Sequence, residues 1–475
     1  MFNNSATRLP TPESGKEDNK SATRLPTPDS DEENNKSATR LPTPSHATLI
    51  TDSVPDDAPF SCRYLDHAPK TSHGTYLHGS NLDLEPLGHY QNGGYHPVHL
   101  GDYLGASGRY RVLHKLGYGG FGTVWLCRDT LNASYVAVKV IAGDVEPDNM
   151  LDLSLTQLDQ SIPGAEYITT PLDHFSVDGP NGTHQCIVLP VLGPRVSDIW
   201  MQMGKDPGPI LQKMAHQAAK ALNFLHKNKF CHGDFRPSNI LVKIANLDHL
   251  SEDELVALIG QPKKTEVRSV SGGILPASSP RYLVLPADID RLGAEYLTDQ
   301  ICVIDFGESF PISSPPDDLG IPEHYLPPEV LLEEANAIGP ACDLWALGCT
   351  LFEIREQIPL FYMIPDDQEL IAEMVRFFGK LPEGWWDKWE GRADYFDEQG
   401  QWLRPTSHDW SLEVALSKPS SFIPGPDHTE GMPTSLITPV AEQKLMADLL
   451  YKLFRYEPGE RLSTEEVLDH EWFKM

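Results

Sequence analysis

Short runs of apolar, β-branched and aromatic residues follow one another after Tyr110. The runs RYRVLHKL, TVWLCRDT and YVAVKVIA are typical of strands in an antiparallel sheet. Beyond Gly193 the apolar residues recur every three to four positions, which predicts amphipathic helices. In the clearest example, GPILQKMAHQAAKALNFLH, the recurring positions are Leu211, Met214, Ala218, Leu222 and Leu225. The pattern predicts a bilobal α+β protein, with a small antiparallel β-rich lobe joined near residues 189–193 to a large, mainly helical lobe.

The first 80 residues have a different composition. The octet SATRLPTP occurs three times, every sixteen residues, with polar and mostly acidic spacers between the copies. So few apolar residues cannot offset the ~1 to 2 kcal/mol that ordering each residue costs, which predicts a disordered tail over residues 1–80. Each octet carries Thr-Pro with Arg three residues before the Thr, at Thr11, Thr27 and Thr43. These positions suit modification by a proline-directed kinase, and the alternative is an expanded linker without a regulatory role.

The composition narrows the classes of partner. Lys and Arg total 38 against 68 for Asp and Glu, a formal charge of -30, which disfavours nonspecific contact with nucleic acid or acidic lipid and favours basic partners. The seven scattered cysteines predict reduced thiols, without disulfides or zinc. The start of the chain lacks an apolar targeting segment, and no stretch reaches the ~18 apolar residues of a membrane span. We therefore expect a soluble, monomeric, intracellular protein of the cytoplasm, the nucleus or both.

A glycine motif follows the first predicted strand. The segment GYGGFGTV, from Gly117 to Val124, has the form GxGxxGxV, in which Gly117, Gly119 and Gly122 let backbone N–H groups approach phosphates. Leu116 and Val124 are placed to sandwich an adenine ring. A dinucleotide-binding loop would need a helix directly after the glycines, and a strand-like run follows instead.

Lys139 lies in an apolar strand twenty-two residues after Gly117. A single Lys in such a strand is usually a solvated edge residue. Because it follows the glycine loop, we expect this Lys to pair with the α and β phosphates of a nucleotide.

Two acidic motifs complete the candidate chemistry. In CHGDFRPSNIL, Asp234 and Asn239 keep the spacing D-x-x-x-x-N, which lets one short loop aim a carboxylate at a substrate hydroxyl and an amide oxygen at a metal ion. About sixty residues later, VIDFGESF supplies Asp305 in the tripeptide Asp-Phe-Gly. The order of these motifs makes a chance match a poor explanation.

Further motifs follow in the same order: GIPEHYLPPE ending at Glu329, DLWALGC from Asp343, Arg461 in YEPGERLS, and HEWF near the end of the chain. With them, residues 109–475 resemble the eukaryotic protein kinases. The resemblance implies an N-lobe over 109–192 and a C-lobe over 193–475, with residues 81–108 as a lead-in segment.

The kinase resemblance also implies the roles of individual residues. ATP is the phosphate donor and Mg²⁺ the cofactor, with Asn239 and Asp305 as metal ligands. Asp234, Arg236 and Lys139 are implied as catalytic residues, and Glu329, Asp343 and Arg461 as structural support. The implied ATP-binding residues are Leu116, Gly117, Gly119, Gly122, Val124, Ala137, Lys139 and Leu192.

Within the kinases, the chain resembles the SR-protein kinase branch. The similarity lies in YHPVHLGDYL before the glycine loop, WLCRD after it, and a long spacer insert over about residues 243–298. This resemblance implies Ser phosphorylation in basic, Arg/Ser-rich protein substrates. Ser251 and Glu254 form a capping-box pattern ahead of ELVALIG, which predicts that the insert is partly folded.

Three positions depart from the kinase pattern. Gly233 stands where an Arg usually precedes the catalytic Asp, and in many kinases that Arg pairs with a phosphate on the activation segment. The segment from Asp305 to Glu329 is short, and its hydroxyls apart from Tyr325 are those of Ser309, Ser313 and Ser314. We therefore predict activity that does not depend on phosphorylation of this segment.

The other departures concern Arg236 and Asp152. Arg236 replaces the usual Lys two residues after Asp234, and we expect it to contact the transferring phosphate. The candidate helix PDNMLDLSLTQLDQ lacks the Glu that should pair with Lys139, and its spacing puts Asp152, or Leu151, at that position. If neither serves, the fold is a slow enzyme or an ATP-binding scaffold, a pseudokinase. A small-molecule kinase of the aminoglycoside or choline type is the other alternative, because it shares the HGD loop. Pro237 and Gly320-x-Pro322 favour Ser/Thr over Tyr specificity.

Overall fold

The computed structural model describes residues 71–79, 83–143, 150–199, 206–245, 247–404, 411–421 and 435–475. The chain divides into two units, Met1–Ser61 and Cys62–Met475, and every element below belongs to the second. The SATRLPTP repeats, and the disorder predicted for residues 1–70, lie outside the described residues.

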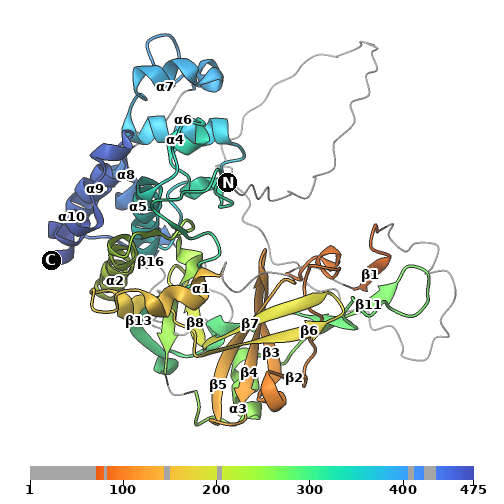
Figure 1. Ribbon diagram of the computed structural model, residues 1–475. Coiled ribbons are helices and arrows are strands. Elements are labelled where there is room, and N and C mark those ends of the chain that lie inside the picture. Colours follow the sequence, from red (N-terminus) through yellow and green to blue (C-terminus); the bar gives the residue numbers. More distant parts are fainter. Residues whose placement is uncertain are drawn as a thin grey trace, which may run out of the picture. The chain divides into compact units, whose positions relative to one another are not determined.

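A six-stranded antiparallel sheet forms the N-terminal lobe (Figure 1). Its strands, in spatial order, are β2 (Tyr103–Leu104), β3 (Tyr110–Gly119), β4 (Gly122–Asp129), β5 (Ser134–Ile141), β7 (Gly182–Pro190) and β6 (Asp173–Gly179). The glycine motif forms the tip of the β3–β4 hairpin, where Gly117 pairs with Val124 and Gly119 with Gly122. A strand therefore follows the glycines, as the sequence predicts.

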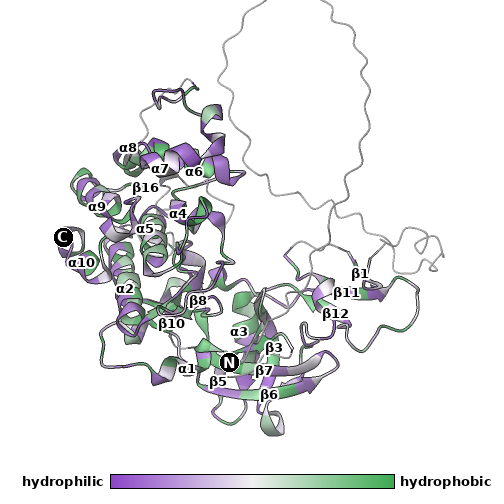
Figure 2. Ribbon diagram, turned by 45° about the horizontal axis from the view of Figure 1, so that its top comes forward, coloured by the Kyte–Doolittle hydropathy of each residue, from purple (hydrophilic) through white to green (hydrophobic). Residues whose placement is uncertain are grey.

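Helices dominate the second lobe. The bounds are α2 (Gly208–Lys227), α4 (Pro328–Leu331), α5 (Pro340–Glu356), α6 (Asp367–Phe378), α7 (Glu383–Lys388), α8 (Leu412–Ser417), α9 (Val440–Leu453) and α10 (Thr464–Leu468). The five apolar positions predicted to form one stripe of α2 are completely buried, and they pack with α5 and α9 in one hydrophobic core. Figure 2 shows the hydrophobic colouring on α2 and α5 within the lobe and along β5 in the sheet. The predicted α+β bilobal fold is confirmed.

Short strands of the second lobe hold the loops that carry the candidate chemistry. A three-stranded sheet has the order β13 (Leu297–Val303), β10 (Ile240–Ile244) and β8 (Leu192–Arg195). Two-residue pairs join β9 (Phe230–Cys231) to β14 (Phe310–Pro311), and β15 (Ser420–Ser421) to β16 (Ser435–Leu436).

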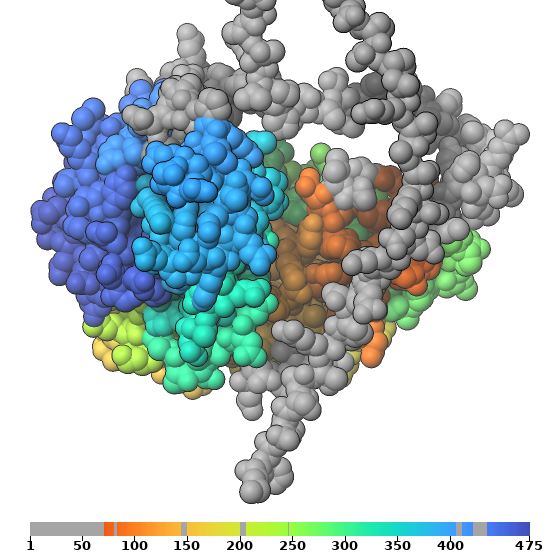
Figure 3. Space-filling model, turned by 90° about the horizontal axis from the view of Figure 1, so that it is seen from above, coloured from red at the N-terminus to blue at the C-terminus, as the bar shows by residue number. Residues whose placement is uncertain are grey.

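The insert is folded and packs against the N-terminal lobe. It contains α3 (Glu252–Ile259), β11 (Lys264–Ser269) and β12 (Tyr282–Val284). The predicted capping box is present at the start of α3, with Glu254 N–H donating to the Ser251 hydroxyl. The buried residues Leu255 and Ile259 of α3 contact Leu113 and Leu126 of the sheet. The insert therefore belongs with the N-lobe in space, although it follows C-lobe elements in sequence; Figure 3 shows its green atoms beside the orange strands.

The predicted boundary of the tail at residue 80 is wrong for its last residues. Thr75–His78 form β1, which pairs antiparallel with β11 of the insert, side by side in Figure 1. A strand that completes a sheet with a partner about 190 residues away gains its hydrogen bonds from tertiary structure, which local composition does not encode. Among the described residues no helix has both the length and the apolar character needed to cross a membrane.

Candidate active site

One cavity of about 480 Å³ lies between the sheet and the second lobe. All eight residues predicted to bind ATP line it: Leu116, Gly117, Gly119, Gly122, Val124, Ala137, Lys139 and Leu192. Asp152 and Asp305 line it as well. The structure thus brings together side chains from β3, β4, β5 and the segment joining the lobes.

The glycine loop uses its glycines in two ways. A Cβ at Gly117 or Gly119 would meet nothing within 4 Å, so the backbone there is open to a ligand. At Gly122, φ is +151° and a Cβ would lie 2.1 Å from the Val140 carbonyl oxygen, so this position requires glycine. The Phe121 ring at the tip lies over Gly307, where a Cβ would come within 2.8 Å of it.

Lys139 forms an ion pair at the back of the cavity. Its Nζ donates to Asp305 Oδ1 at 2.8 Å. Burial disfavours the ammonium, but the carboxylates of Asp152 and Asp305 outweigh that effect and raise the pKa of Lys139. Burial likewise disfavours the Asp305 carboxylate, and Lys139 reverses the effect, so the pKa of Asp305 is lowered.

Asp152 is the residue of the candidate helix that reaches this cavity, whereas Leu151 packs on the hydrophobic core. The helix is much shorter than predicted, since α1 covers only Leu151–Ser154, followed by a 3-10 turn at Leu155–Gln157. Because the ion pair of Lys139 is with Asp305, its pairing with Asp152 stays a prediction.

The loop after β9 fixes the carboxylate of Asp234. Its Oδ1 accepts from Arg236 Nε at 2.8 Å, and its Oδ2 accepts from Asn239 Nδ2 at 2.7 Å. The Asn239 nitrogen also donates to the Asp234 carbonyl at 2.9 Å, so the amide oxygen of Asn239 is the group that can face a metal ion. Asp234, at 9% exposure, is thus held in one orientation. Its loop lies beside the cavity, because Ser238 of the same loop lines the cavity wall.

Asp305 has a left-handed backbone conformation, with φ of +63°. This conformation is uncommon for a residue with a side chain and persists where the surroundings impose it, often at functional sites. The next residue, Phe306, is buried and its ring lies 5.1 Å from that of His232. Phe306 thus anchors the turn that presents Asp305 to Lys139.

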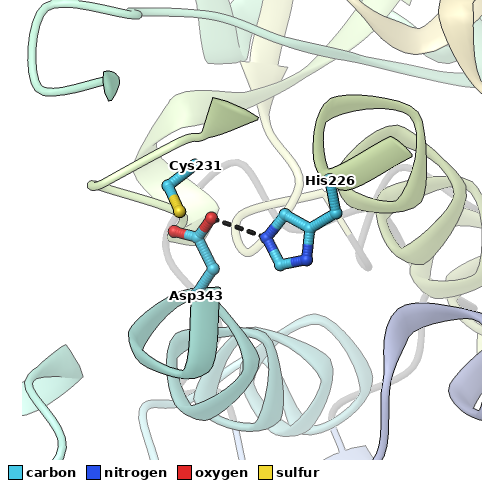
Figure 4. A group of neighbouring side chains, drawn as sticks. All are labelled: His226, Cys231 and Asp343. Carbon is cyan, nitrogen blue, oxygen red and sulfur yellow. Dashed lines mark hydrogen bonds and ion pairs between the residues drawn. The ribbon is translucent and has the colours of Figure 1, made fainter. Parts of the chain in front are cut away.

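Asp343 supports the loop of Asp234 from below. Its Oδ2 accepts the His232 N–H at 2.8 Å, and its Oδ1 accepts the Gly233 N–H at 3.0 Å. Figure 4 shows its carboxylate between His226, which bonds to it at 2.9 Å, and Cys231. These three side chains lie close enough to consider a metal site. However, burial raises the pKa of the Cys231 thiol, and both Asp343 oxygens already accept hydrogen bonds, so we interpret the group as structural support.

Glu329 and Arg461 form a second support. Arg461 Nη1 and Nη2 donate to the two Glu329 oxygens at 2.6 and 2.7 Å, and both side chains are at most 1% exposed. The guanidinium also lies 5.1 Å from the centre of the Trp345 ring. Helix α4 directly follows the activation segment. The buried bidentate pair ties this helix to the turn before α10, which contains Arg461.

Gly233 explains the missing Arg before Asp234. Its φ is +80°, and a Cβ would lie 2.1 Å from the Glu308 carbonyl oxygen. Any side chain here would push away the segment that follows Asp305. That segment is fixed by other contacts: Ser309 Oγ donates to the His232 carbonyl at 2.6 Å, and β14 pairs with β9.

Sequence reasoning missed part of the cavity wall. Residues 286–290 of the insert line it, together with Arg195 and Asp198 from the segment after the lobe junction. No motif marks residues 286–290, because they reach the cavity only through the packing of α3 on the sheet.

Comparison with known proteins agrees with this geometry. The protein kinase domain model matches residues 110–252 and 294–473, so its gap falls within the insert. The chain is 27% identical over 419 residues to a serine/threonine-protein kinase SRPK of Physarum polycephalum, covering 82% of this chain and 92% of the relative. It is 26% identical over 392 residues to the dual specificity protein kinase CLK1 of Homo sapiens, covering 79% and 67%.

A shorter match, to the SRSF protein kinase 3 of Homo sapiens, is 38% identical over 167 residues and covers 33% of this chain and 29% of the relative. These relatives confirm the predicted resemblance to the SR-protein kinase branch. The family model matches more than half of the sequence, and the chain therefore belongs to the protein kinase domain family.

Proposed function

We propose that this chain is an ATP-dependent serine/threonine protein kinase that phosphorylates Ser in basic, Arg/Ser-rich proteins. One observation carries the proposal: the open glycine loop and the Lys139–Asp305 ion pair line one cavity, and the loop that holds the carboxylate of Asp234 contributes Ser238 to the same cavity. Relatives named as serine/threonine and SRSF protein kinases agree with this class.

The residues present fit ATP and Mg²⁺. Asp305 and the amide oxygen of Asn239 are hard oxygen donors of the kind that Mg²⁺ prefers, and the ion would neutralise charge on the β and γ phosphates. The N–H groups of the glycine loop and Lys139 would hold the phosphates. Asp234 orients the Ser hydroxyl and accepts its proton, and Arg236 is expected to contact the transferring phosphate through its terminal nitrogens. Catalysis then consists mainly of positioning and charge stabilisation.

The charges around Asp234 favour a basic substrate. Burial raises the pKa of Glu308, and the charges of Asp234, Asp305 and Asp318 raise it further. Burial also raises the pKa of Glu353, with a contribution from Asp198. Several carboxylates therefore lie near Asp234, and arginines of a substrate would add favourable charge contacts there.

The contacts of the activation segment support activity without phosphorylation. Gly233 offers no guanidinium to a phosphate, and Ser309 already donates its hydroxyl to the catalytic loop. The β9–β14 pair and the close approach of Gly233 to Glu308 fix the start of the segment through backbone contacts.

The alternatives make different predictions. A pseudokinase would bind ATP and Mg²⁺ without transfer, and the ion pair of Lys139 with Asp305, instead of Asp152, keeps that alternative open. A small-molecule kinase would phosphorylate a sugar or an amine and no peptide. The predicted monomeric state, the lack of direct nucleic-acid binding and the intracellular location stay predictions.

Radiolabelled ATP with a panel of acceptors tests the proposal. We expect transfer to Ser of an Arg-Ser repeat peptide, with kcat/KM at least about tenfold above that of a Lys-rich Ser peptide of equal charge, and no transfer to aminoglycosides or choline. Equal use of both peptides would contradict the Arg/Ser preference, and transfer to none would contradict the kinase assignment.

A charge variant adds a test of the preference itself. Glu308→Gln should raise KM for the Arg-Ser peptide about three- to tenfold, because one charge contact is worth ~1 kcal/mol at a partly exposed site, and it should leave the ATP affinity unchanged. Asp317→Asn, which removes a charge from an exposed position of the same segment, is the matched control. Equal effects of the two variants would mean that only net charge matters.

A further inference from the structure

Two segments outside the kinase family match hold the strand and loop that cover the candidate ATP site. The family model leaves out residues before 110 and between 252 and 294. Glu85 and Tyr95 lie in the first segment and Ala287 in the second, and all three contact β3 or its glycine loop.

Lys115, two residues before Gly117, is the centre of these contacts. Its ammonium is completely buried and forms an ion pair with Glu85, which is 1% exposed. The same ammonium lies 5.2 Å from the centre of the Tyr118 ring in the glycine loop. The Lys115 carbonyl accepts the N–H of Ala287 at 2.7 Å, which brings the insert to the same point. A buried charge that loses its partner is strongly destabilising, so Lys115 and Glu85 are held together. Their ion pair therefore fixes the base of the glycine loop.

Tyr95 reaches the tip of the loop. Its hydroxyl donates to the carbonyl of Gly119, and its side chain is buried. The Tyr95 backbone is itself fixed, because its carbonyl accepts from Asn181 Nδ2 at 2.6 Å and Gly94 accepts from Gly143 N–H at 2.9 Å. The lead-in segment thus ties the glycine loop to the ends of β5 and β6.

We infer that Tyr95 is a positioning residue for ATP, which holds the glycine loop in its nucleotide-binding conformation before the nucleotide arrives. Glycines lose more conformational freedom on ordering than any other residue, so a loop ordered in advance binds phosphates with a smaller entropic cost. The inference rests on the proposed ATP site and adds a role for a segment that lies outside the kinase family match.

Tyr95→Phe removes the one hydrogen bond and keeps the buried ring. With full-length protein, calorimetry with Mg²⁺ and a non-hydrolysable ATP analogue should show an affinity about two- to tenfold weaker, the equivalent of one hydrogen bond. Hydrogen exchange of the nucleotide-free protein should be faster at residues 117–121 than in the wild type. The melting temperature and kcat at saturating ATP should stay close to those of the wild type. Tyr103→Phe, which removes an exposed hydroxyl, is the matched control.

Unchanged affinity and exchange, or changes equal to those of Tyr103→Phe, would overturn the inference. A fall in kcat and melting temperature together would also overturn it, since it would show a structural role alone. The binding readout is independent of phosphoryl transfer, so a protein that binds the analogue but phosphorylates nothing would refute the proposed function and leave this inference standing. A wild-type protein that binds no nucleotide would refute both.

Discussion

At the scale of single residues, Gly233 connects a departure in sequence with a feature of the structure. The left-handed φ and the 2.1 Å approach of a built Cβ to the Glu308 carbonyl leave no room for Arg. Kinases with Arg at this position can use a phosphate to order the activation segment. Here the start of that segment contacts the loop of Asp234 through this close backbone approach and through the Ser309 hydrogen bond to the His232 carbonyl, which supports the proposed independence from phosphorylation.

The serines of the segment test this account. Ser313 and Ser314 are exposed, and we expect the double variant Ser313→Ala/Ser314→Ala to keep kcat/KM within about twofold of the wild type. Ser309→Ala should lower activity, because it removes a hydrogen bond worth ~1 kcal/mol between the segment and the catalytic loop. Steady-state kinetics on phosphatase-treated protein measures both effects. More than tenfold loss in the double variant would contradict phosphorylation-independent activity.

Single residues also mark where sequence reasoning worked and where it did not. Seven of the eight ATP-site candidates meet at one cavity because their motif spacing follows from one hairpin and one neighbouring strand, and Leu192 of β8 joins them where the chain enters the second lobe. The orientation of Lys139 could not be predicted, since its choice between Asp152 and Asp305 depends on tertiary distances. The sequence showed that Gly233 replaces the usual Arg. It could not show the reason, which is the close approach of the Gly233 and Glu308 backbones.

At the scale of elements, helix α5 ends with two ionisable side chains, Arg355 and Glu356, that are buried in the second lobe. Arg355 pairs with Glu442 of α9 at 2.6 Å, and the neighbouring Glu356 accepts a hydrogen bond from Thr438. Burial raises the pKa of Glu356 to about 7, against lowering contributions from Thr438 and Arg355. The folded state therefore holds a proton on Glu356 that the unfolded state releases near pH 4.5.

This proton predicts a pH dependence of stability. A carboxyl whose folded pKa is raised binds more protons in the folded state, so its contribution is lost as pH rises from about 4.5 to about 7. Glu356→Gln should match the wild type near pH 4 and be more stable by roughly 3 kcal/mol near pH 8, because each unit of pKa difference corresponds to ~1.4 kcal/mol. Urea unfolding at both values measures the difference, with exposed Glu457→Gln as the control. An equal effect of Glu356→Gln at both values would rule out the raised pKa.

Elements with strong periodicity were predictable. Helix α2 and the strands of the N-terminal sheet follow their hydrophobic patterns, and the capping box marked the start of α3. Strand β1 and the wall formed by residues 286–290 were not predictable, because both depend on contacts between segments far apart in the chain. The predicted helix around Asp152 was too long, since α1 ends at Ser154 and a 3-10 turn follows over Leu155–Gln157.

At the scale of the whole molecule, the insert and the lead-in segment extend the N-terminal lobe that covers ATP. The buried residues Leu255 and Ile259 of α3 join the core with Leu113 of β3 and Leu126 of β4, and Ala287 attaches the insert to Lys115. The segments that distinguish this chain from the family model therefore lie on the side of the cavity that carries the proposed nucleotide-binding residues. Glu308, Asp234 and Asp318 lie close enough to affect one another's charge, which agrees with the proposed preference for a basic substrate and with the formal charge of -30.

Phosphoryl transfer requires that Asp234 receives the substrate hydroxyl next to the bound ATP. The variant Asp234→Asn therefore tests the central claim most directly. The substitution keeps the shape of the side chain and changes no residue that lines the cavity, so the affinity for a non-hydrolysable ATP analogue should stay within about twofold of the wild type. Transfer of radiolabelled phosphate to the Arg-Ser peptide should fall at least about 10³-fold, because the group that accepts the Ser proton is lost. Activity close to that of the wild type in Asp234→Asn would contradict the account.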